Sequence, residues 1–214
     1  MAADSIEEMK VFKIPHVEGF TATNVLTRQE CAELIRAAEA SGFKGSGKDG
    51  GPYFAGNRLR TTIPNATSWS ERLFTRLQPF LSPVHHQSQS FNYDLLGPPV
   101  PSGKYVPVAV NDLLRVSKYV PYGQFGIHED SGYVRDDQYV GFWTLLLYLN
   151  DDFEGGETTI YGANDDLAYT VQPEVGKAFA FYHFQPHAGL MIKSGSKLVV
   201  RTEIMFALEK KGEN

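Results

Sequence analysis

The sequence contains one cysteine and no apolar stretch of the ~20 residues that a membrane-spanning helix needs. A lone thiol at Cys31 excludes an internal disulfide, so burial and hydrogen bonding must hold the fold together. Residues 1–10 lack the basic start and the hydrophobic run of a signal peptide. We therefore expect an intracellular, cytoplasmic protein with no membrane partner.

The sequence also lacks an excess of basic residues. Lysine and arginine number 20 against 25 aspartates and glutamates, which gives a formal net charge of -5. Proteins that bind nucleic acids mainly through phosphate contacts carry basic surfaces, so a nucleic-acid partner is disfavoured. The acidic stretches at residues 129–137 and 150–154 either favour a cationic or neutral substrate or form solvated loops, and the second interpretation is preferred. Nothing in the sequence indicates an oligomeric state.

The N-terminal part carries two helix signals. Thr27 followed by Glu30, and Ser68 followed by Glu71, both match the capping-box pattern that starts helices. Apolar residues at helical spacing follow each box, which predicts two amphipathic helices that pack against a sheet. The stripes consist of Cys31, Leu34, Ile35 and Ala38 in the first helix and Leu73, Phe74, Leu77, Phe80 and Leu81 in the second.

Strand-like sequence dominates the second half. Runs rich in β-branched, aromatic and aliphatic residues alternate with clusters of glycine, proline, asparagine and aspartate. These runs are Leu113–Val120, Val140–Leu149, Lys177–Phe184 and Leu198–Leu208. Helices followed by many strands predict an α+β fold, with a sandwich or barrel in the second half.

Two further segments are predicted not to form regular structure. Gly42–Gly56 is glycine-rich and is expected to be a mobile loop, and Leu96–Pro107 is expected to be a connector because it contains several prolines. For the wider segment Gly42–Thr62, two interpretations remain open. It either closes over a pocket as a lid or forms an ordinary surface loop.

A histidine and a carboxylate stand two residues apart in Phe125–Asp130. In an extended strand, residues i and i+2 point to the same side, so His128 and Asp130 could share one metal ion. A second histidine would complete the set of two histidines and one carboxylate that suits iron(II). His187, which follows a predicted strand and stands beside small residues, is the preferred third ligand. His183 lies inside that strand, and a structural role is expected for it.

Two cations lie after these ligands. Lys197 stands at the start of the last predicted strand and Arg201 four residues later, so both could point inward. A buried cation is costly unless it is paired, and a dicarboxylate co-substrate would supply the partner. A solvated surface position remains open for Lys197. For Arg201, an ion pair with another strand remains open, whereas a pair with Glu203 is not expected.

Two tyrosines within apolar strands are further candidates. A buried phenol normally finds a hydrogen-bond partner, so Tyr119 or Tyr148 could donate to the carboxylate of the co-substrate. The alternative for both is an ordinary place in the aromatic core.

Four segments carry a family resemblance, in the family's order. They are Arg115–Asp130 (RVSKYVPYGQFGIHED), Thr144–Glu157 (TLLLYLNDDFEGGE), Val171–Phe181 (VQPEVGKAFAF) and His187–Phe206 (HAGLMIKSGSKLVVRTEIMF). Together they resemble the prolyl 4-hydroxylase-like branch of the 2-oxoglutarate- and iron(II)-dependent dioxygenases. The resemblance implies a double-stranded β-helix, or jelly roll, with N-terminal flanking helices. It also implies a single domain over residues 1–214, with helical support at about 20–85 and the jelly-roll core at about 105–208.

The resemblance also implies a site and a reaction. The matched residues are the metal ligands His128, Asp130 and His187 and the 2-oxoglutarate contacts Lys197, Arg201, Tyr148 and Tyr119. The implied cofactors are Fe(II), 2-oxoglutarate and O2, with ascorbate as a supporting reductant. The implied reaction is hydroxylation of an amino-acid residue, a prolyl residue included, in a peptide or protein. The alternatives are hydroxylation of a free amino acid or small metabolite, and a non-catalytic jelly-roll module that binds or senses a ligand.

The sequence departs from the family pattern at two places. The tryptophan usual on the last strand is absent, since Glu203, Met205 and Phe206 occupy that region. In the first segment, Tyr122 stands where a glycine usually follows the proline, and the glycine is displaced to Gly123. Specificity for peptidyl-proline therefore does not follow from the resemblance, whereas the metal ligands are unaffected.

Overall fold

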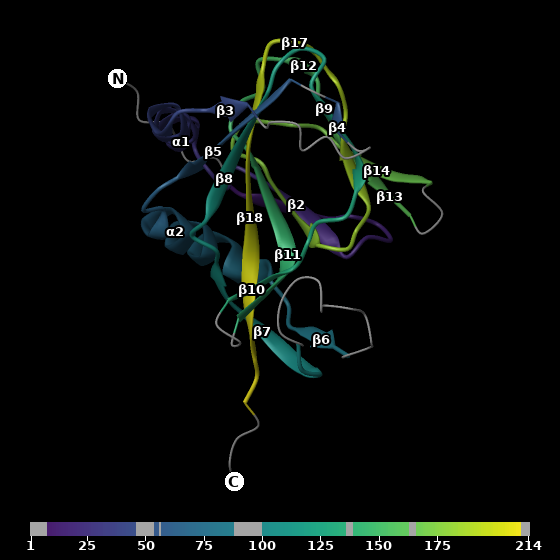
Figure 1. Cartoon of the computed structure of the whole chain (residues 1–214). Helices are drawn as coiled ribbons and strands as arrows, with labels where there is room; N and C mark the ends of the chain where they lie inside the picture. Colours follow the sequence, from purple (N-terminus) through teal and green to yellow (C-terminus); the bar gives the residue numbers. More distant parts are fainter. Residues whose placement is uncertain are drawn as a thin grey trace.

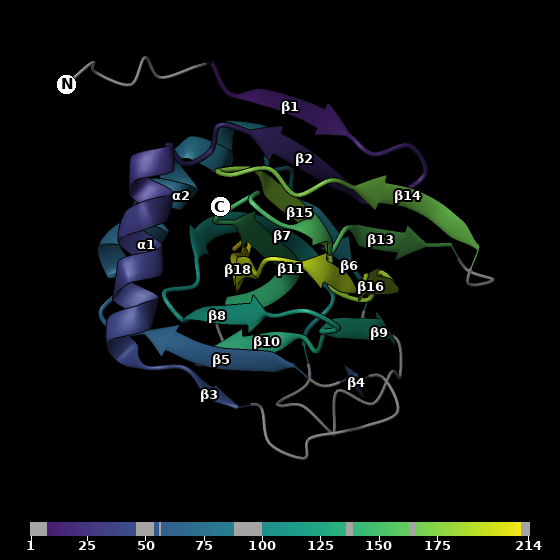
Figure 2. The ribbon, with the colours of Figure 1, turned by 90° about the horizontal axis from the view of Figure 1, so that it is seen from above.

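The computed structural model describes residues 8–45, 54–55, 57–87, 100–135, 139–162 and 166–210. Most strands belong to two sheets that face each other, and two helices cover the outer side of the larger sheet, as Figures 1 and 2 show from two directions. The space between the two sheets is where the predicted metal ligands come together.

The larger sheet contains strands from both ends of the chain. Its hydrogen-bonded order is β1-β2-β15-β11-β18-β8-β5-β3, with β10 paired to β11 and with β7 paired to both β18 and β6. The strands are β1 (Lys10–Lys13), β2 (Gly19–Thr23), β3 (Lys44–Gly45), β5 (Arg58–Ile63), β6 (Val84–His86), β7 (Gly103–Val110), β8 (Leu114–Tyr119), β10 (Tyr133–Arg135), β11 (Tyr139–Tyr148), β15 (Ala178–Tyr182) and β18 (Lys197–Leu208).

The smaller sheet has the order β14-β13-β16-β9-β4. Its strands are β4 (Phe54–Ala55), β9 (Gln124–His128), β13 (Thr158–Tyr161), β14 (Leu167–Val171) and β16 (His187–Gly189). A separate two-stranded ribbon pairs β12 (Glu154–Gly155) with β17 (Ile192–Ser194).

The chain passes repeatedly between the sheets from β8 onward. Strands β8, β11, β15 and β18 lie side by side in the larger sheet, and β9, β13, β14 and β16 come between them in sequence and form the smaller one together with β4. This arrangement is a double-stranded β-helix, so the predicted jelly roll is confirmed. The four strands that the sequence predicted correspond to β8, β11, β15 and β18, with bounds that agree to within two residues.

Alternation along the central strands produces two separate cores. Leu147 and Val200 belong to the cluster that includes the buried faces of the two helices, whereas their neighbours Tyr148 and Val199 belong to a second cluster. That second cluster also contains Ile160 of β13, so it lies between the two sheets. Successive strand residues point to opposite faces, which is why two residues adjacent in sequence serve different cores.

The helices are α1 (Arg28–Ser41) and α2 (Thr67–Leu77), the latter followed by the 3-10 turn η1 (Gln78–Phe80). The predicted capping box at Thr27 forms, and Cys31 is fully buried in α1. The second predicted box is wrong: α2 begins at Thr67, its N-cap is Ala66 without a side-chain hydrogen bond, and Ser68 is already helical. In the part of the chain that the structure describes, no helix combines the length and the hydropathy needed to span a bilayer.

Five short strands in the N-terminal part were not predicted. β1 and β2 extend the larger sheet beyond β15, β5 and β3 extend it beyond β8, and β4 pairs with β9, so β3 and β4 form strands inside the predicted loop Gly42–Gly56. Because β5 covers Arg58–Ile63, the end of the Gly42–Thr62 segment is a paired strand and not a loop. Residues 46–53 and 56 of that segment lie outside the described residues.

The predicted connector Leu96–Pro107 is shorter than expected. Residues 88–99 lie outside the described part of the chain, and Pro107 belongs to β7. Proline cannot donate to a strand ladder and is typical of irregular pairing. The register of β7 against β18 accordingly shifts between Met205 and Phe206, the residue that faces Pro107.

A buried carboxylate joins the two helices. Glu30 of α1 accepts hydrogen bonds from Arg72 at 2.9 Å and from Arg76 at 2.8 Å, and both arginines belong to α2. Burial acts to raise the pKa of Glu30, but Arg76, the Thr27 backbone and Arg72 outweigh it and lower the pKa to about 2. The charged form of Glu30 therefore stabilises the helix pair.

Glu30→Gln keeps the shape of the side chain and removes its charge. We expect this change to lower the free energy of unfolding at pH 7 by about 1 kcal/mol, because two partly exposed ion pairs are lost. The folded carboxyl titrates near 2 and the unfolded one near its ordinary value of 4.5, so the difference should be full above pH 4.5 and shrink as pH falls towards 2. Urea unfolding at several pH values measures it.

Glu33→Gln on the same helix is the matched control, since Glu33 accepts an exposed hydrogen bond from Gln29 of the same helix. A stability loss in Glu30→Gln that does not depend on pH, or that equals the loss in the control, would contradict this account of the helix pair.

Candidate active site

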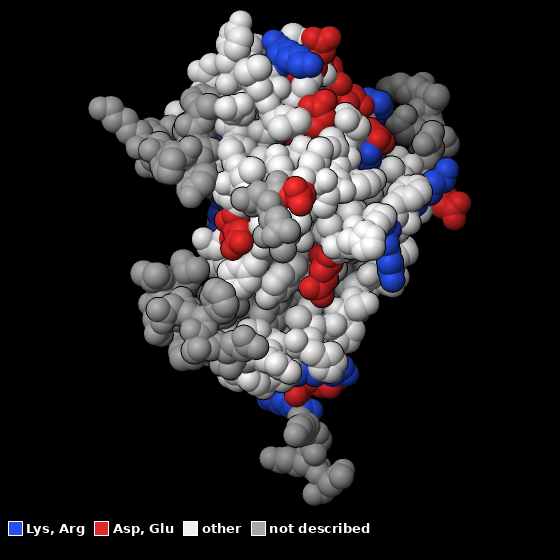
Figure 3. All heavy atoms as spheres, turned by 90° about the vertical axis from the view of Figure 1, so that its right-hand side faces the viewer, with Lys and Arg blue, Asp and Glu red and all other residues white. Residues whose placement is uncertain are grey.

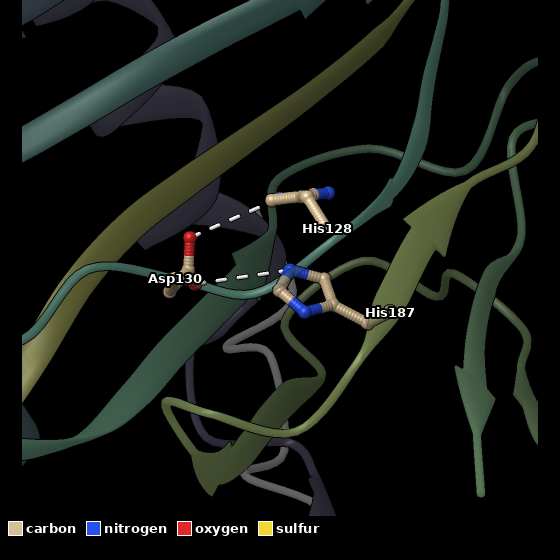
Figure 4. A group of neighbouring side chains, drawn as sticks. All are labelled: His128, Asp130 and His187. Atoms are coloured by element: carbon tan, nitrogen blue, oxygen red, sulfur yellow. Dashed lines mark ion pairs between the residues drawn. The ribbon is translucent and has the colours of Figure 1, made fainter. Parts of the chain in front are cut away.

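The two histidines are cross-strand neighbours. His128 is the last residue of β9 and His187 the first of β16, and the two residues pair directly in the smaller sheet. Their ring centroids are 4.1 Å apart. Because directly paired residues on adjacent strands share one face of a sheet, both rings point towards the same carboxylate, as Figure 4 shows.

Asp130 approaches the histidines from the segment that follows β9. The strand ends at His128, so Asp130 lies outside the extended strand that was expected to hold both residues. Its carboxylate oxygens lie 3.8 Å from Nε2 of His128 and 3.7 Å from Nε2 of His187 (Figure 4). One ligand atom from each of the three residues lies within 4.8 Å of the others, a group that could hold a metal ion.

Three neighbours fix the position of Asp130. Its backbone N–H donates to the carbonyl oxygen of His183 at 2.9 Å. Thr144 Oγ1 donates to Oδ2 at 2.6 Å, and Nη2 of Arg201 lies 3.1 Å from Oδ1. Burial acts to raise the pKa of Asp130, but Arg201, His187 and Thr144 outweigh it and hold the pKa below its ordinary value. His183 itself is buried with its Nδ1 at 3.1 Å from the Gly141 carbonyl oxygen, which agrees with the structural role expected for it.

The protonation pattern of the rings fits a metal ion. Nδ1 of His128 lies 2.8 Å from the Gly126 carbonyl oxygen, and Nδ1 of His187 lies 2.9 Å from that of Gln185. A carbonyl oxygen only accepts, so each Nδ1 carries the proton and each Nε2 keeps its lone pair. Both lone pairs face the Asp130 carboxylate, and three electron-rich groups turned towards one point suit a cation between them.

The neutral state of both rings follows from their surroundings. Burial lowers the pKa of His128 to about 4, and the nearby His187 adds to this effect. Burial also lowers the pKa of His187, although Asp130 opposes the shift. Imidazole binds metals only in its neutral form, so at neutral pH the two rings are ready to act as ligands.

A cavity of about 760 Å³ extends from these three residues across the inner face of the larger sheet. Lys197, at the start of β18, lines it together with Val199 and Arg201, as strand parity predicted. The Lys197 ammonium donates to the Gly156 carbonyl oxygen at 2.5 Å. Burial lowers the pKa of Lys197 to about 7, and Glu157 opposes the shift. The surface position left open for Lys197 is thus ruled out, because the side chain is buried.

The two candidate tyrosines take different positions. Tyr119 lines the cavity, sits opposite Lys197 in the β8–β18 register, and accepts a hydrogen bond from Nη1 of Arg58 at 3.3 Å. Tyr148 is fully buried, and its hydroxyl donates to Thr158 Oγ1 at 2.8 Å. The Lys197 ammonium lies 5.2 Å from the centre of the Tyr148 ring. Tyr148 therefore reaches the cavity through Thr158 and Lys197 and not by its own hydroxyl.

Arg201 pairs with two carboxylates. Besides Asp130, its Nη2 lies 3.9 Å from Oε1 of Glu203, so the expectation that Glu203 would not pair with it is wrong. Both side chains leave the same face of β18, and the length of the guanidinium group spans the gap along the strand. Glu203 pairs more closely with Arg115 of β8, at 2.8 Å.

Several residues of the candidate site were not predicted from the sequence. Thr144 is a polar position in the otherwise apolar strand β11, a pattern that could have marked it. Arg115 alternates with the apolar residues of β8, but alternation does not say which face lines a cavity. These residues became identifiable only when the strand register was known.

Comparison with known proteins agrees with this site. Residues 114–204 match the sequence model of the 2OG-Fe(II) oxygenase superfamily, a stretch that contains all three candidate metal ligands. A protein of Acanthamoeba polyphaga mimivirus, provisionally named a prolyl 4-hydroxylase, is 22% identical over 204 residues, which cover 86% of this chain and 73% of that protein.

Solved structures share the fold. The viral collagen prolyl hydroxylase of Paramecium Bursaria Chlorella virus-1, solved with 2OG, has a TM-score of 0.58 at 21% identity and covers 90% of this chain and 98% of its own. OsALKBH1 has a TM-score of 0.59 at 17% identity and covers 89% of this chain and 100% of its own. At these identities the likeness establishes the fold alone.

Fold, site chemistry and sequence match together define the chain as a 2-oxoglutarate- and iron(II)-dependent oxygenase, an enzyme that uses Fe(II), 2-oxoglutarate and O2. Residues 114–204 carry the match to the 2OG-Fe(II) oxygenase superfamily, and the proteins similar to the chain include prolyl 4-hydroxylases.

Thr144→Val removes the hydroxyl that holds Asp130 and preserves the shape of the side chain. We expect the Mn(II) dissociation constant to rise about 10- to 100-fold, because partners of metal ligands typically contribute this much to affinity. Electron paramagnetic resonance of free Mn(II) measures the change.

Thr202→Val is the matched control, because Thr202 is an equally buried strand threonine whose hydroxyl donates to the Asn111 carbonyl oxygen and not to Asp130. Equal Mn(II) affinity in the two variants would show that Thr144 does not hold the carboxylate for a metal.

Proposed function

We propose that this oxygenase hydroxylates an amino-acid residue in a peptide or protein, with a prolyl residue as the first candidate. The observation that carries the proposal is the convergence of His128, Asp130 and His187 at one cavity with a buried lysine. The names of the mimivirus relative and of the Chlorella-virus structure, both prolyl hydroxylases, support this substrate class. Because OsALKBH1 shares the fold, the fold alone does not choose the substrate.

A second candidate is hydroxylation of a free amino acid or small metabolite. A cavity of about 760 Å³ falls within the usual size range of small-molecule sites, which favours a ligand that the cavity largely encloses. Both candidates use the same metal and co-substrate site.

In this proposal, His128, Asp130 and His187 hold iron(II). When bound, the iron together with 2-oxoglutarate and O2 supplies the oxidation of an unactivated C–H bond. Burial keeps the two rings neutral, and the carbonyl groups of Gly126 and Gln185 hold the single proton of each ring on Nδ1. Thr144 and Arg201 orient the Asp130 carboxylate before any ligand binds.

Lys197 is proposed to bind the distal carboxylate of 2-oxoglutarate. A cation held in a buried cavity is stabilised by an anion that brings its own charge into the same space. Tyr119 and Thr158 line the same region and offer hydroxyl groups, and Tyr148 fixes the Thr158 hydroxyl. Arg201 remains the alternative anchor, but its contact with Asp130 makes Lys197 the preferred one.

The enzyme incubated with Fe(II), ascorbate and labelled 2-oxoglutarate should release succinate. His128→Ala, Asp130→Ala and His187→Ala should each lose Mn(II) binding and reduce succinate formation to the background level, because each removes one of three ligands. His85→Ala, on the exposed side of β6, should change neither. Normal succinate release by any of the three ligand variants would refute the assigned metal site.

The affinity for 2-oxoglutarate should depend on pH through Lys197. The ammonium must be protonated to bind a carboxylate, and its pKa in the free enzyme is about 7. The dissociation constant should therefore be steady below about pH 7 and rise about tenfold per pH unit above it, until the higher pKa in the complex is passed. The titratable and charged groups around Lys197 are Glu157, Tyr119 and Tyr148, with Arg58 one strand further.

Two variants separate this effect from other titrations. Lys197→Arg carries a charge throughout the range, so its dissociation constant should lose the dependence on pH. Lys197→Met should abolish 2-oxoglutarate binding and raise the melting temperature, because the cost of burying a cation disappears. Calorimetric titration measures affinity, and a wild-type dissociation constant that stays flat across neutral pH would rule out Lys197 as the anchor.

A further inference from the structure

The cavity wall formed by β3, β5 and β8 is basic. It contains Lys44, Arg58, Arg60 and Arg115, and none of the described residues of these strands that line the cavity is an aspartate or glutamate. The chain as a whole has a formal net charge of -5, and Figure 3 shows acidic side chains gathered near the upper end of one outer face. The positive charge is therefore a local property of the cavity.

The strand register places two of these arginines beside the metal site. Arg201 of β18 stands directly opposite Arg115 of β8, and Arg115 stands opposite Thr62 of β5. Since Arg201 lies 3.1 Å from Asp130, Arg115 is one strand away from a side chain that touches the candidate metal ligand. Arg60 is two residues before Thr62 on the same strand face, which makes it a diagonal neighbour of Arg115.

Arg60 and Arg115 are close enough to share one ligand group. Diagonal neighbours on adjacent strands stand about 7–8 Å apart at the backbone, a gap that two long side chains close easily. An oxyanion between two guanidinium groups can accept hydrogen bonds from both of them.

Arg115 is held in place without using all its donors. Its Nη1 donates to Oε1 of Glu203 at 2.8 Å, and Glu203 also accepts a hydrogen bond from Asn111 at 2.7 Å. A guanidinium group has five N–H donors, so this single bond fixes the side chain and leaves other donors for a ligand. The Arg115 side chain keeps 34% of its surface exposed, and Arg60 is an exposed residue on the cavity wall.

The co-substrate does not account for these two arginines. Its distal carboxylate is assigned to Lys197, which lies in a different cross-strand row with Tyr119 and Arg58. Its other end faces the metal ligands. Arg60 and Arg115 occupy the wall between the metal site and the edge strand β3, a region that remains for the substrate.

We propose, on the basis of the function proposed above, that the substrate is an anion whose carboxylate or phosphate group is bound by Arg60 and Arg115. The arginine fork matches both oxyanions with paired hydrogen bonds, and a basic wall in a cavity raises the local concentration of anions while it repels cations. The acidic residue Glu129, next to Asp130 in the sequence, also lines the cavity. The target carbon then lies near the anionic group of the substrate.

Matched ligands test the charge preference directly. The probes are free amino acids and acetylated peptides that are identical except at one residue. They form matched pairs: aspartate with asparagine, glutamate with glutamine, and phosphoserine with serine. The enzyme is loaded with Mn(II) and 2-oxoglutarate, and paramagnetic relaxation of the ligand protons reports binding near the metal. We expect the acidic member of a bound pair to have a dissociation constant about tenfold or more below that of its neutral partner, and the phosphate arm decides between the two oxyanions.

Variants assign the preference to the two arginines. Arg60→Gln and Arg115→Gln should each reduce the acidic-to-neutral preference to about twofold or less, and Arg60→Glu should favour lysine over glutamine in a further matched pair. Arg60→Lys should keep part of the preference. Arg36→Gln, on an exposed position of α1 outside the cavity, is the control and should leave the preference unchanged.

The outcomes separate the two proposals. If the wild-type enzyme releases succinate and binds 2-oxoglutarate but no acidic probe binds better than its neutral partner, the anionic-substrate proposal is overturned and the proposed function stands. If no probe of the panel binds, the anionic-substrate proposal is overturned as well. A preference that survives both Arg60→Gln and Arg115→Gln overturns the assignment to these residues. Failure to bind Mn(II) and 2-oxoglutarate refutes the proposed function itself.

Discussion

Two imidazole lone pairs and a carboxylate face one another in a buried space, and much of the surrounding structure holds these mutually repelling groups together. The pairing of β9 with β16 sets His128 beside His187. The His183 carbonyl, Thr144 and Arg201 then fix Asp130 from three directions. Such a site is costly to assemble without a cation. Its rigidity before any ligand arrives is what suits it to hold a metal in one geometry.

The outer face of the larger sheet contributes mainly to stability, and the inner face carries residues of the candidate site. The outer face packs apolar residues such as Leu147 and Val200 in the cluster that includes the helix residues, where burial stabilises the fold. The inner face carries charged groups on strands that would otherwise be apolar, with Lys197 as the extreme case. A buried ammonium whose pKa has fallen to about 7 reduces stability, and this cost is what makes the site favourable for an incoming diacid.

The sequence predicted the parts of the molecule in which local pattern and tertiary role agree. The apolar runs of β8, β11, β15 and β18, the capping box at Thr27, and the histidines and aspartate of the site all belong to this class. The strand β5 was missed because its inward residues are arginines that face a cavity, which makes its alternation look like that of a surface loop. The box at Ser68 misled because the N-cap lies two residues earlier, at Ala66, so that the helix begins at Thr67.

The register of the strands could not be predicted from the sequence. It determines which charged side chains of the cavity become neighbours. Asp130, Arg201, Glu203 and Arg115 form a series of alternating sign, with neighbouring groups at 3.1, 3.9 and 2.8 Å. In a partly buried series of this kind, each charge is compensated only by its neighbours. The register therefore connects the carboxylate that would hold a metal to the arginine proposed to bind the substrate, through Arg201 and Glu203.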